Sequence, residues 1–166
     1  MPWDIILCVD QSGSMASSVI HSAVMAGILA GLPALNISLV VFDTNVVDLS
    51  GFVDDPVEAL MSVQLGGGTD IAQALGYCSR LVKTPHRTVL ALVSDFAEGG
   101  SVAHMLAIAK AIRESGVTAI GLASLDEGAN AFYDVQTGER LADLGWHIAA
   151  MTPRHFAHWL AGIIRK

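Results

Sequence analysis

The chain has 166 residues, of which 52% are apolar and 15% are charged, and its formal net charge is −7 at pH 7. This length is typical of one domain that buries roughly 70% of its unfolded surface, and the composition excludes a disordered chain. An acidic chain with 9 Lys plus Arg residues offers no basic stripe to a phosphate backbone, so we expect no nucleic-acid partner.

No apolar run reaches the ~18 residues of a membrane-spanning helix. The closest segment, residues 19–35, is interrupted by glycine, proline, serine and histidine. Met1–Asp4 leads at once into a strand-like run and has no signal-peptide features. Cys8 and Cys78 show no metal or disulfide spacing, and we expect reduced, packed thiols. The sequence therefore predicts a cytoplasmic protein without a membrane span.

Apolar runs of strand length alternate with segments of helical period along the whole chain. In chain order we expect strand Trp3–Val9, helix Met15–Leu32, strands Ile37–Phe42 and Val46–Leu49, helix Asp70–Leu81, strand Thr88–Val93, helix Val102–Glu114, strand Val117–Ala123, helix Ala131–Leu144, a weak strand His147–Ala150 and helix Pro153–Ile164. Residues 54–63 are ambiguous and suit a short helix. The strands are continuously apolar, which is typical of parallel strands covered on both faces.

The loop Asp43-Thr44-Asn45 is too short for a crossover, so the strands on either side of it must be antiparallel neighbours. The sequence thus predicts an α/β fold, namely a Rossmann-like open sheet of about six mostly parallel strands with one antiparallel edge strand and helices on both faces. Such sheets bind ligands at the carboxyl ends of their strands.

Oxygen-bearing side chains gather at three of these strand-to-helix junctions. They are the carboxylates and hydroxyls of Asp10, Ser12, Ser14, Thr69 and Asp95. Mg²⁺ prefers six oxygen ligands and usually keeps several waters. Two carboxylates and three neutral hydroxyls leave room for an acidic side chain from another molecule. The pattern therefore predicts a metal site that recruits a partner, with Asp10, Ser12, Ser14, Thr69 and Asp95 as its residues.

Each junction also has a plain structural explanation. Asp10 alone suits a strand-end turn, Ser12 or Ser14 suits a helix N-cap, and the glycines 66–68 suit a flexible loop. It is the combination of all three junctions in this order that favours the metal site.

Three neighbours of these residues have predicted roles of their own. We expect Asp70 to favour the first turn of the following helix. Phe96 and Glu98 follow Asp95 and are expected at the edge of the ion. For Phe96, an apolar contact for a partner and a packing role at the end of the sheet are equally compatible with the sequence.

The order Asp10-x-Ser12-x-Ser14, then Thr69, then Asp95 resembles the metal-ion-dependent adhesion site of von Willebrand factor type A (VWA) domains. The resemblance covers the whole alternation of elements. It implies a sheet sandwiched between helices that binds Mg²⁺ (or Mn²⁺ or Ca²⁺). It also implies a protein ligand that donates an Asp or Glu carboxylate to the ion.

Residues 63–71 and 94–100 resemble more narrowly the bacterial CoxE-like branch of these domains. This resemblance implies that residues 1–166 are one VWA domain excised from the C-terminal part of a longer protein. It also implies a partnership with an AAA+ ATPase of the MoxR type.

We expect a non-catalytic protein, but two other function classes stay open. The first is a metal-dependent phosphoesterase, for which no base or nucleophile stands in a recognisable arrangement. A haloacid-dehalogenase-like enzyme needs a second Asp where Ser12 stands, and a P-loop needs Lys after Gly68. The second is a scaffold with a vestigial site that uses an apolar face of helix Met15–Leu32.

Overall fold

The computed structural model describes residues 2–31, 35–52, 55–63, 65–126 and 128–165. Its centre is a seven-stranded sheet in the order β3-β2-β1-β4-β5-β6, with β7 also paired to β5. The strands are β1 Trp3–Asp10, β2 Leu35–Phe42, β3 Val46–Asp48, β4 Thr88–Ser94, β5 Thr118–Leu125, β6 Ala131–Phe132 and β7 His147–Ala149. The helices are α1 Val19–Ala30, α2 Pro56–Ser62, α3 Ile71–Leu81, α4 Val102–Glu114, α5 Val135–Asp143 and α6 Pro153–Ile164, with 3₁₀ turns η1 Gly13–Ser18, η2 Ser50–Phe52 and η3 Pro85–Arg87.

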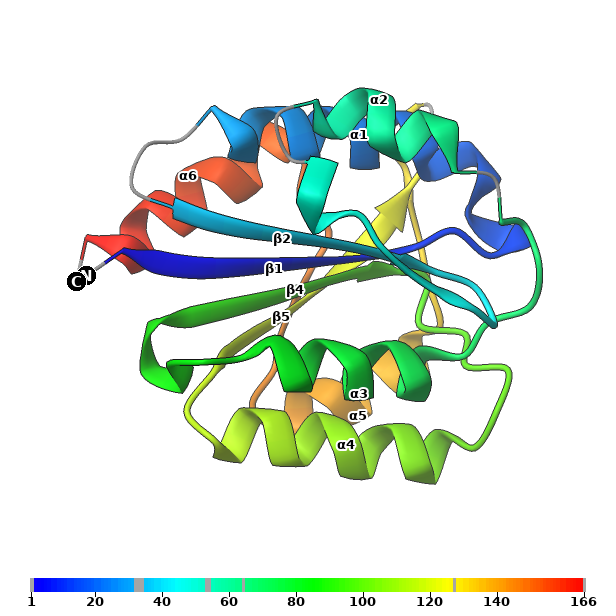
Figure 1. The fold of residues 1–166 in the computed structure, drawn as a ribbon. Helices are drawn as coiled ribbons and strands as arrows, with labels where there is room; N and C mark the ends of the chain where they lie inside the picture. The colour runs from blue at the N-terminus through cyan, green and yellow to red at the C-terminus, as the bar shows by residue number, and fades with distance from the viewer. Residues whose placement is uncertain (1, 32–34, 53–54, 64, 127, 166) are drawn as a thin grey trace.

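Helices cover both faces of the sheet, with α1, α2 and α6 on one side and α3, α4 and α5 on the other (Figure 1). The five strands β2, β1, β4, β5 and β7 are parallel to one another, and β3 runs antiparallel to β2 at the edge. The predicted fold class, including its antiparallel edge strand, is confirmed.

The two faces of β1 explain its continuous apolar sequence. Ile6 and Cys8 pack in the layer with α3 and α4, whereas Ile5, Leu7 and Val9 pack in the layer with α1 and α6. Because successive side chains of a strand point to opposite faces, a strand between two helical layers needs apolar residues at every position.

The predicted helix Ala131–Leu144 begins too early. Residues Ala131–Phe132 form β6, which pairs antiparallel with β5, and the helix starts only at Val135. Asp134 sets this start because its side chain accepts a hydrogen bond from the backbone N–H of Thr137 at 3.0 Å.

The other helix predictions agree with the structure to within a few residues. The segment predicted as helix Met15–Leu32 begins in a 3₁₀ turn, η1, and continues as α1 to Ala30, while Leu32 lies outside the described residues. Within the ambiguous residues 54–63, residues 56–62 form α2, while Asp54 lies outside the described residues. None of the described helices has the length and apolar character to cross a membrane.

Candidate metal centre

The pairing of β1 with β4 brings two of the predicted residues to the same edge of the sheet. Val9 lies opposite Val93, so Asp10 at the end of β1 stands beside Ser94, and Asp95 follows directly. The Ser94 hydroxyl donates a hydrogen bond of 2.6 Å to Asp10 Oδ2. The strand register therefore fixes Asp10 next to the turn that carries Asp95.

The turn after β1 carries the two serines toward Asp95. The Ser12 N–H donates to Asp10 Oδ1 at 2.9 Å, which closes the turn. Ser12 precedes η1 but makes no side-chain capping bond, and its hydroxyl lies 3.4 Å from that of Ser14. The Ser14 hydroxyl donates to Asp95 Oδ2 at 2.6 Å. The structure thus links Asp10, Ser12, Ser14 and Asp95 in one polar cluster.

The glycine-rich loop lies against this turn through backbone contacts. The Gly13 N–H donates to Gly67 O, and the Gly66 N–H donates to Gln11 O, both at 2.9 Å. A Cβ atom on Gly13 would lie only 3.3 Å from Gly66 O, so the two backbones approach closely. The small residues of both segments allow this approach.

Thr69 reaches the same edge at the end of that loop. Its carbonyl accepts a hydrogen bond of 3.0 Å from the N–H of Gly99, in the segment that follows Asp95. A Cβ on Gly99 would stand 2.7 Å from this carbonyl, closer than real side chains come. The N–H of the next residue, Asp70, donates to Asp43 O at 3.0 Å. Thr69 is therefore held between the ends of β2 and β4.

Sequence reasoning missed the part that Asp43 plays. Asp43 is buried at the end of β2, and its Oδ2 accepts the Gly67 N–H at 3.0 Å. Its Oδ1 accepts the Asn45 N–H at 2.8 Å. A third strand-end carboxylate thus anchors the glycine-rich loop, and the position of Asp43 at a strand end was the available signal.

Two acidic residues beside the cluster cap α3. Asp70 accepts the Gln73 N–H at 2.9 Å, which confirms its predicted role at the first helical turn. Glu98 accepts the N–H groups of Ile71 and Ala72 with its two oxygens, both at 3.0 Å. Negative charge at a helix N-terminus is stabilising. Glu98 therefore steadies the helix that follows Thr69.

Phe96 has the packing role rather than an exposed one. Its side chain is fully buried and meets the Tyr133 ring edge-on, with centroids 5.9 Å apart. Its backbone has φ 61°, which is a costly conformation for a bulky residue. The Phe96 N–H donates to the Ser94 hydroxyl at 2.9 Å. The Ser94 hydroxyl therefore holds this turn and also donates to Asp10.

The electrostatics of the cluster suit a cation. Asp10 is 1% exposed, and this burial raises its pKa. Hydrogen bonds from Ser12 and Ser94 oppose the rise, whereas the charge of Asp95 adds to it. The described residues contain no group of three or more His, Cys, Asp or Glu side chains with metal-site geometry, so hydroxyls would have to complete the set. Oxygen-only donors with two carboxylates fit a hard ion such as Mg²⁺; ion binding here stays a prediction.

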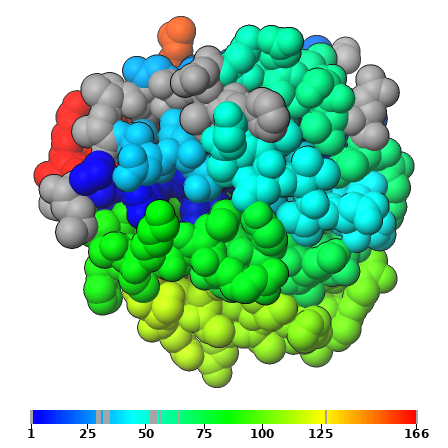
Figure 2. Space-filling view, viewed as in Figure 1, coloured from blue at the N-terminus to red at the C-terminus, as the bar shows by residue number. Residues whose placement is uncertain are grey.

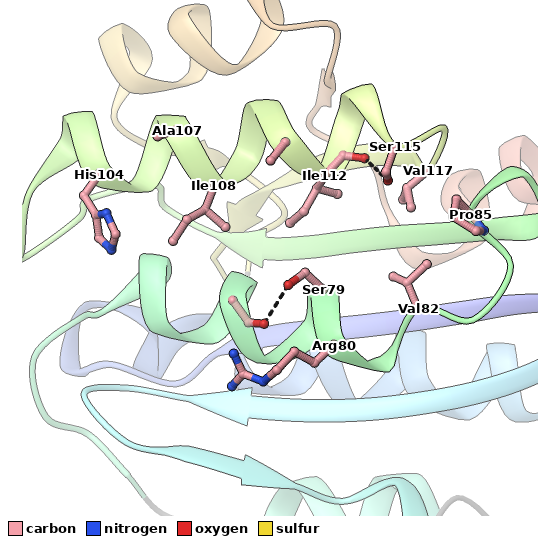
Figure 3. Close-up of a pocket in the computed structure, with 12 residues that line it drawn as sticks. Ser79, Arg80, Val82, Pro85, His104, Ala107, Ile108, Ile112, Ser115 and Val117 are labelled. Carbon is pink, nitrogen blue, oxygen red and sulfur yellow. Dashed lines mark hydrogen bonds between the residues drawn. The ribbon is translucent and has the colours of Figure 1, made fainter.

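A cavity of about 540 Å³ lies elsewhere, between α3 and α4 (Figure 3). Val82, Ile108 and Ile112 form part of its apolar wall, and Arg80 and His104 stand at its margin. None of the five predicted site residues lines it. A smaller cavity of about 270 Å³ includes Ser12 in its lining and so adjoins the polar cluster.

Comparison with known proteins gives one near relative and many similar folds. The chain is 53% identical over 159 residues to the uncharacterized protein YehP of Escherichia coli strain K12. The match covers 96% of this chain but only 42% of YehP, so the chain spans less than half the length of this relative.

Two solved structures illustrate the fold. A von Willebrand factor type A structure from Catenulispora acidiphila matches with a TM-score of 0.70 at 16% identity, over 95% of this chain and 40% of that one. The manganese-loaded TRAP protein of Plasmodium vivax matches with a TM-score of 0.62 at 17% identity, over 90% of this chain and 68% of that one.

The family described as "VWA domain containing CoxE-like protein" matches residues 1–160. This match covers the whole sheet and all of the polar cluster. The chain therefore belongs to the family of VWA domain containing CoxE-like proteins.

Proposed function

We propose that the domain is a cation-dependent protein-binding module with a metal-ion-dependent adhesion site. In this proposal Asp10, Ser12, Ser14, Thr69 and Asp95 hold Mg²⁺, or Mn²⁺ or Ca²⁺ in its place. The ion would supply an open coordination position for an Asp or Glu carboxylate of a partner protein. The chain's own residues hold the ion and orient that position, and no catalytic step is required of them.

The observation that carries the proposal is the convergence of four side chains from two strand ends. The Ser14 hydroxyl lies 2.6 Å from Asp95 Oδ2 and 3.4 Å from the Ser12 hydroxyl, and the Ser12 N–H lies 2.9 Å from Asp10 Oδ1. Such a cluster of buried carboxylates is costly unless hydrogen bonds and an opposite charge offset it. The hydroxyls supply the hydrogen bonds, and a divalent cation would supply the charge.

Family membership supports a protein-interaction module. The manganese in the TRAP structure, whose fold this chain shares, supports a divalent ion as the ligand. The CoxE-like assignment supports an AAA+ ATPase of the MoxR type as the partner. A cytoplasmic location and the absence of a nucleic-acid partner stay predictions from the sequence.

Calorimetric titration with Mg²⁺ tests the ion. We expect the wild type to bind one ion and the variant Asp95→Asn to bind at least about 10-fold more weakly, because it loses one of two charged ligands. The control is Asp143→Asn, which removes an exposed carboxylate on α5 and should leave the affinity unchanged. Equal affinities for wild type and Asp95→Asn would reject the site.

The function classes are separated by two further measurements. Capture of the purified MoxR-type ATPase from the same organism should require Mg²⁺ and be abolished by chelator and by Asp95→Asn. Hydrolysis of phosphomonoesters or phosphodiesters that depends on both Mg²⁺ and Asp95 would instead establish the phosphoesterase alternative. Chelator-independent capture would favour the scaffold with a vestigial site.

A further inference from the structure

Large apolar side chains are exposed on α1 and α2, the two helices beside the polar cluster. Ile20 and Val24 on α1 are 58% and 48% exposed, and Val57 and Met61 on α2 are 42% and 52% exposed. Each pair is four residues apart and so lies on one face of its helix. Figure 2 shows α2, in blue-green, at the surface in the upper part of the view.

The two exposed faces adjoin one another. Gly27 lies three and seven residues after Val24 and Ile20, hence on the same face of α1. A Cβ on Gly27 would stand 3.2 Å from Cγ2 of Val57, so this face of α1 packs directly against α2. The exposed apolar residues of α1 and α2 therefore lie on neighbouring helices, which run side by side over the sheet (Figure 1).

Met61 belongs both to this exposed set and to the lining of the cavity of about 270 Å³ beside the polar cluster. Val19, Leu60, Met61 and Leu65 give the cavity an apolar lining, and Ser12 of the polar cluster is also among its lining residues. We call the cavity with its exposed α1 and α2 flank the rim groove. Its volume lies below the range of about 300–1,000 Å³ of small-molecule pockets, but it is open to the surface and suits part of a peptide chain.

Gln11 lines the rim groove and carries a buried hydrogen-bond acceptor that has no partner in the described part of the chain. Its side chain is 7% exposed, and its Nε2 donates to Leu60 O at 3.4 Å. This bond orients the amide, and its Oε1 has no partner among the described residues. Buried polar atoms are rarely left unpaired in proteins. An N–H group is the partner that this oxygen lacks, and a peptide backbone carries one at nearly every residue.

We propose that the rim groove and the ion together bind one extended segment of a partner protein. An acidic residue of the segment binds the ion, and a large apolar side chain nearby fills the cavity. A backbone N–H between them donates to Gln11 Oε1 after the amide turns toward the groove. This inference rests on the proposed function, because the ion fixes the acidic end of the segment. It commits to an acidic residue next to Leu, Ile, Met or Phe as the recognised chemistry.

Short fluorescein-labelled peptides test the inference by fluorescence polarisation with Mg²⁺. Each carries one central Asp in a Gly/Ser background, and Leu is placed in turn at every position on either side. We expect Leu at one or two positions to tighten binding about tenfold or more over the peptide without Leu. Replacing the Asp by Asn, or Mg²⁺ by chelator, should abolish this binding.

Two variants of the chain locate the contact. Met61→Gln should remove the advantage of Leu, and Gln11→Leu should weaken every Asp peptide, while both variants keep wild-type Mg²⁺ affinity in calorimetry. The matched control is Val135→Gln, which changes a 54% exposed side chain on α5 and should have no effect.

The outcomes separate this inference from the proposed function. Wild-type Mg²⁺ binding with no effect of Leu at any position, or with an effect that Met61→Gln leaves intact, overturns the rim groove and leaves the adhesion site standing. Binding of Leu peptides that persists in chelator also overturns it, because the ion and the groove would then act separately. If the wild-type domain does not bind Mg²⁺ in calorimetry, the proposed function itself is overturned.

Discussion

Asp10 and Asp48 begin the same local motif at the ends of two strands of one sheet. Each is the first residue of an Asp-x-Ser turn, in which the N–H of the serine donates to the Asp Oδ1 at 2.9 Å. Each also accepts a hydroxyl hydrogen bond on its other oxygen, from Ser94 for Asp10 and from Tyr77 for Asp48. In hydrogen bonding the two carboxylates are equivalent.

Their surroundings differ, and so do the directions of their pKa shifts. Burial raises the pKa of Asp10, and the hydrogen bonds from Ser12 and Ser94 do not offset it. At Asp48, which is exposed, burial is still the largest single effect and raises the pKa, but the hydrogen bonds from Ser50 and Tyr77 together outweigh it, so its pKa is lowered. An Asp-x-Ser turn therefore does not by itself indicate a metal site. The two turns differ in burial and in the presence of a second carboxylate, Asp95, beside Asp10.

The largest expected difference between the two turns is in their response to Mg²⁺. At about 100 times its dissociation constant, a ligand of the folded state adds about 2.7 kcal/mol of stability. For a chain of this size each kcal/mol raises the Tm by roughly 2–4 °C. Wild type and Asp48→Asn should both gain this increase in thermal melts, and Asp10→Asn should not. A Tm that is flat in Mg²⁺ for the wild type, or a rise that survives in Asp10→Asn, would contradict the site.

The next largest expected difference is in the free energy of unfolding when the hydroxyl donor to each carboxylate is removed. Ser94→Ala leaves a buried carboxylate without its 2.6 Å partner, and the loss of a hydrogen bond to a buried charged group costs about 1.5–3 kcal/mol. Tyr77→Phe removes the equivalent donor from exposed Asp48, where water replaces it, at a cost below about 1 kcal/mol. Urea unfolding of metal-free protein measures both. Equal costs would show that burial does not distinguish the two turns.

A third carboxylate, that of Glu98, lies at the same edge of the sheet and caps α3. Its substitution tests whether its hydrogen bonds to the helix stabilise the metal-free protein. Glu98 binds two N–H groups at the start of α3, and Glu98→Gln should destabilise the metal-free protein by about 1 kcal/mol. Glu139→Gln, at an exposed position of α5, is the matched control and should change little. A stabilising effect of Glu98→Gln would mean that repulsion from Asp95 outweighs its capping bonds.

The sequence predicted those parts of the fold that follow from periodicity. Continuous apolar runs predicted the parallel strands, and the three-residue loop at Asp43 predicted the antiparallel edge. The start of α5 was placed too early because Ala131 and Phe132 are compatible with a helix until their pairing with β5 is known. The capping side chain of Asp134, three residues before Thr137, was the local signal that would have corrected it.

At the candidate site, residue types and order predicted which side chains meet, but not how they are supported. The convergence of Asp10, Ser12, Ser14 and Asp95 was expected from their positions at strand ends. Ser94 was not singled out, because its bond to Asp10 depends on the β1–β4 register. The burial of Phe96 was likewise not predictable, because its side chain packs against Tyr133, which is distant in sequence.

The smallest expected effect concerns pH and has its origin at Asp48. The folded state lowers the pKa of Asp48, so this carboxylate contributes stability above its unfolded pKa of about 3.9. That contribution is lost as the pH falls through the lower folded-state pKa, because the folded protein must then take up the proton too. Part of it comes from the Tyr77 hydroxyl, so the difference in Tm between wild type and Tyr77→Phe should be present at neutral pH and vanish in acid. Metal-free melts from pH 7 downward measure it, and a difference that grows in acid would mean that Tyr77 stabilises the protonated form instead.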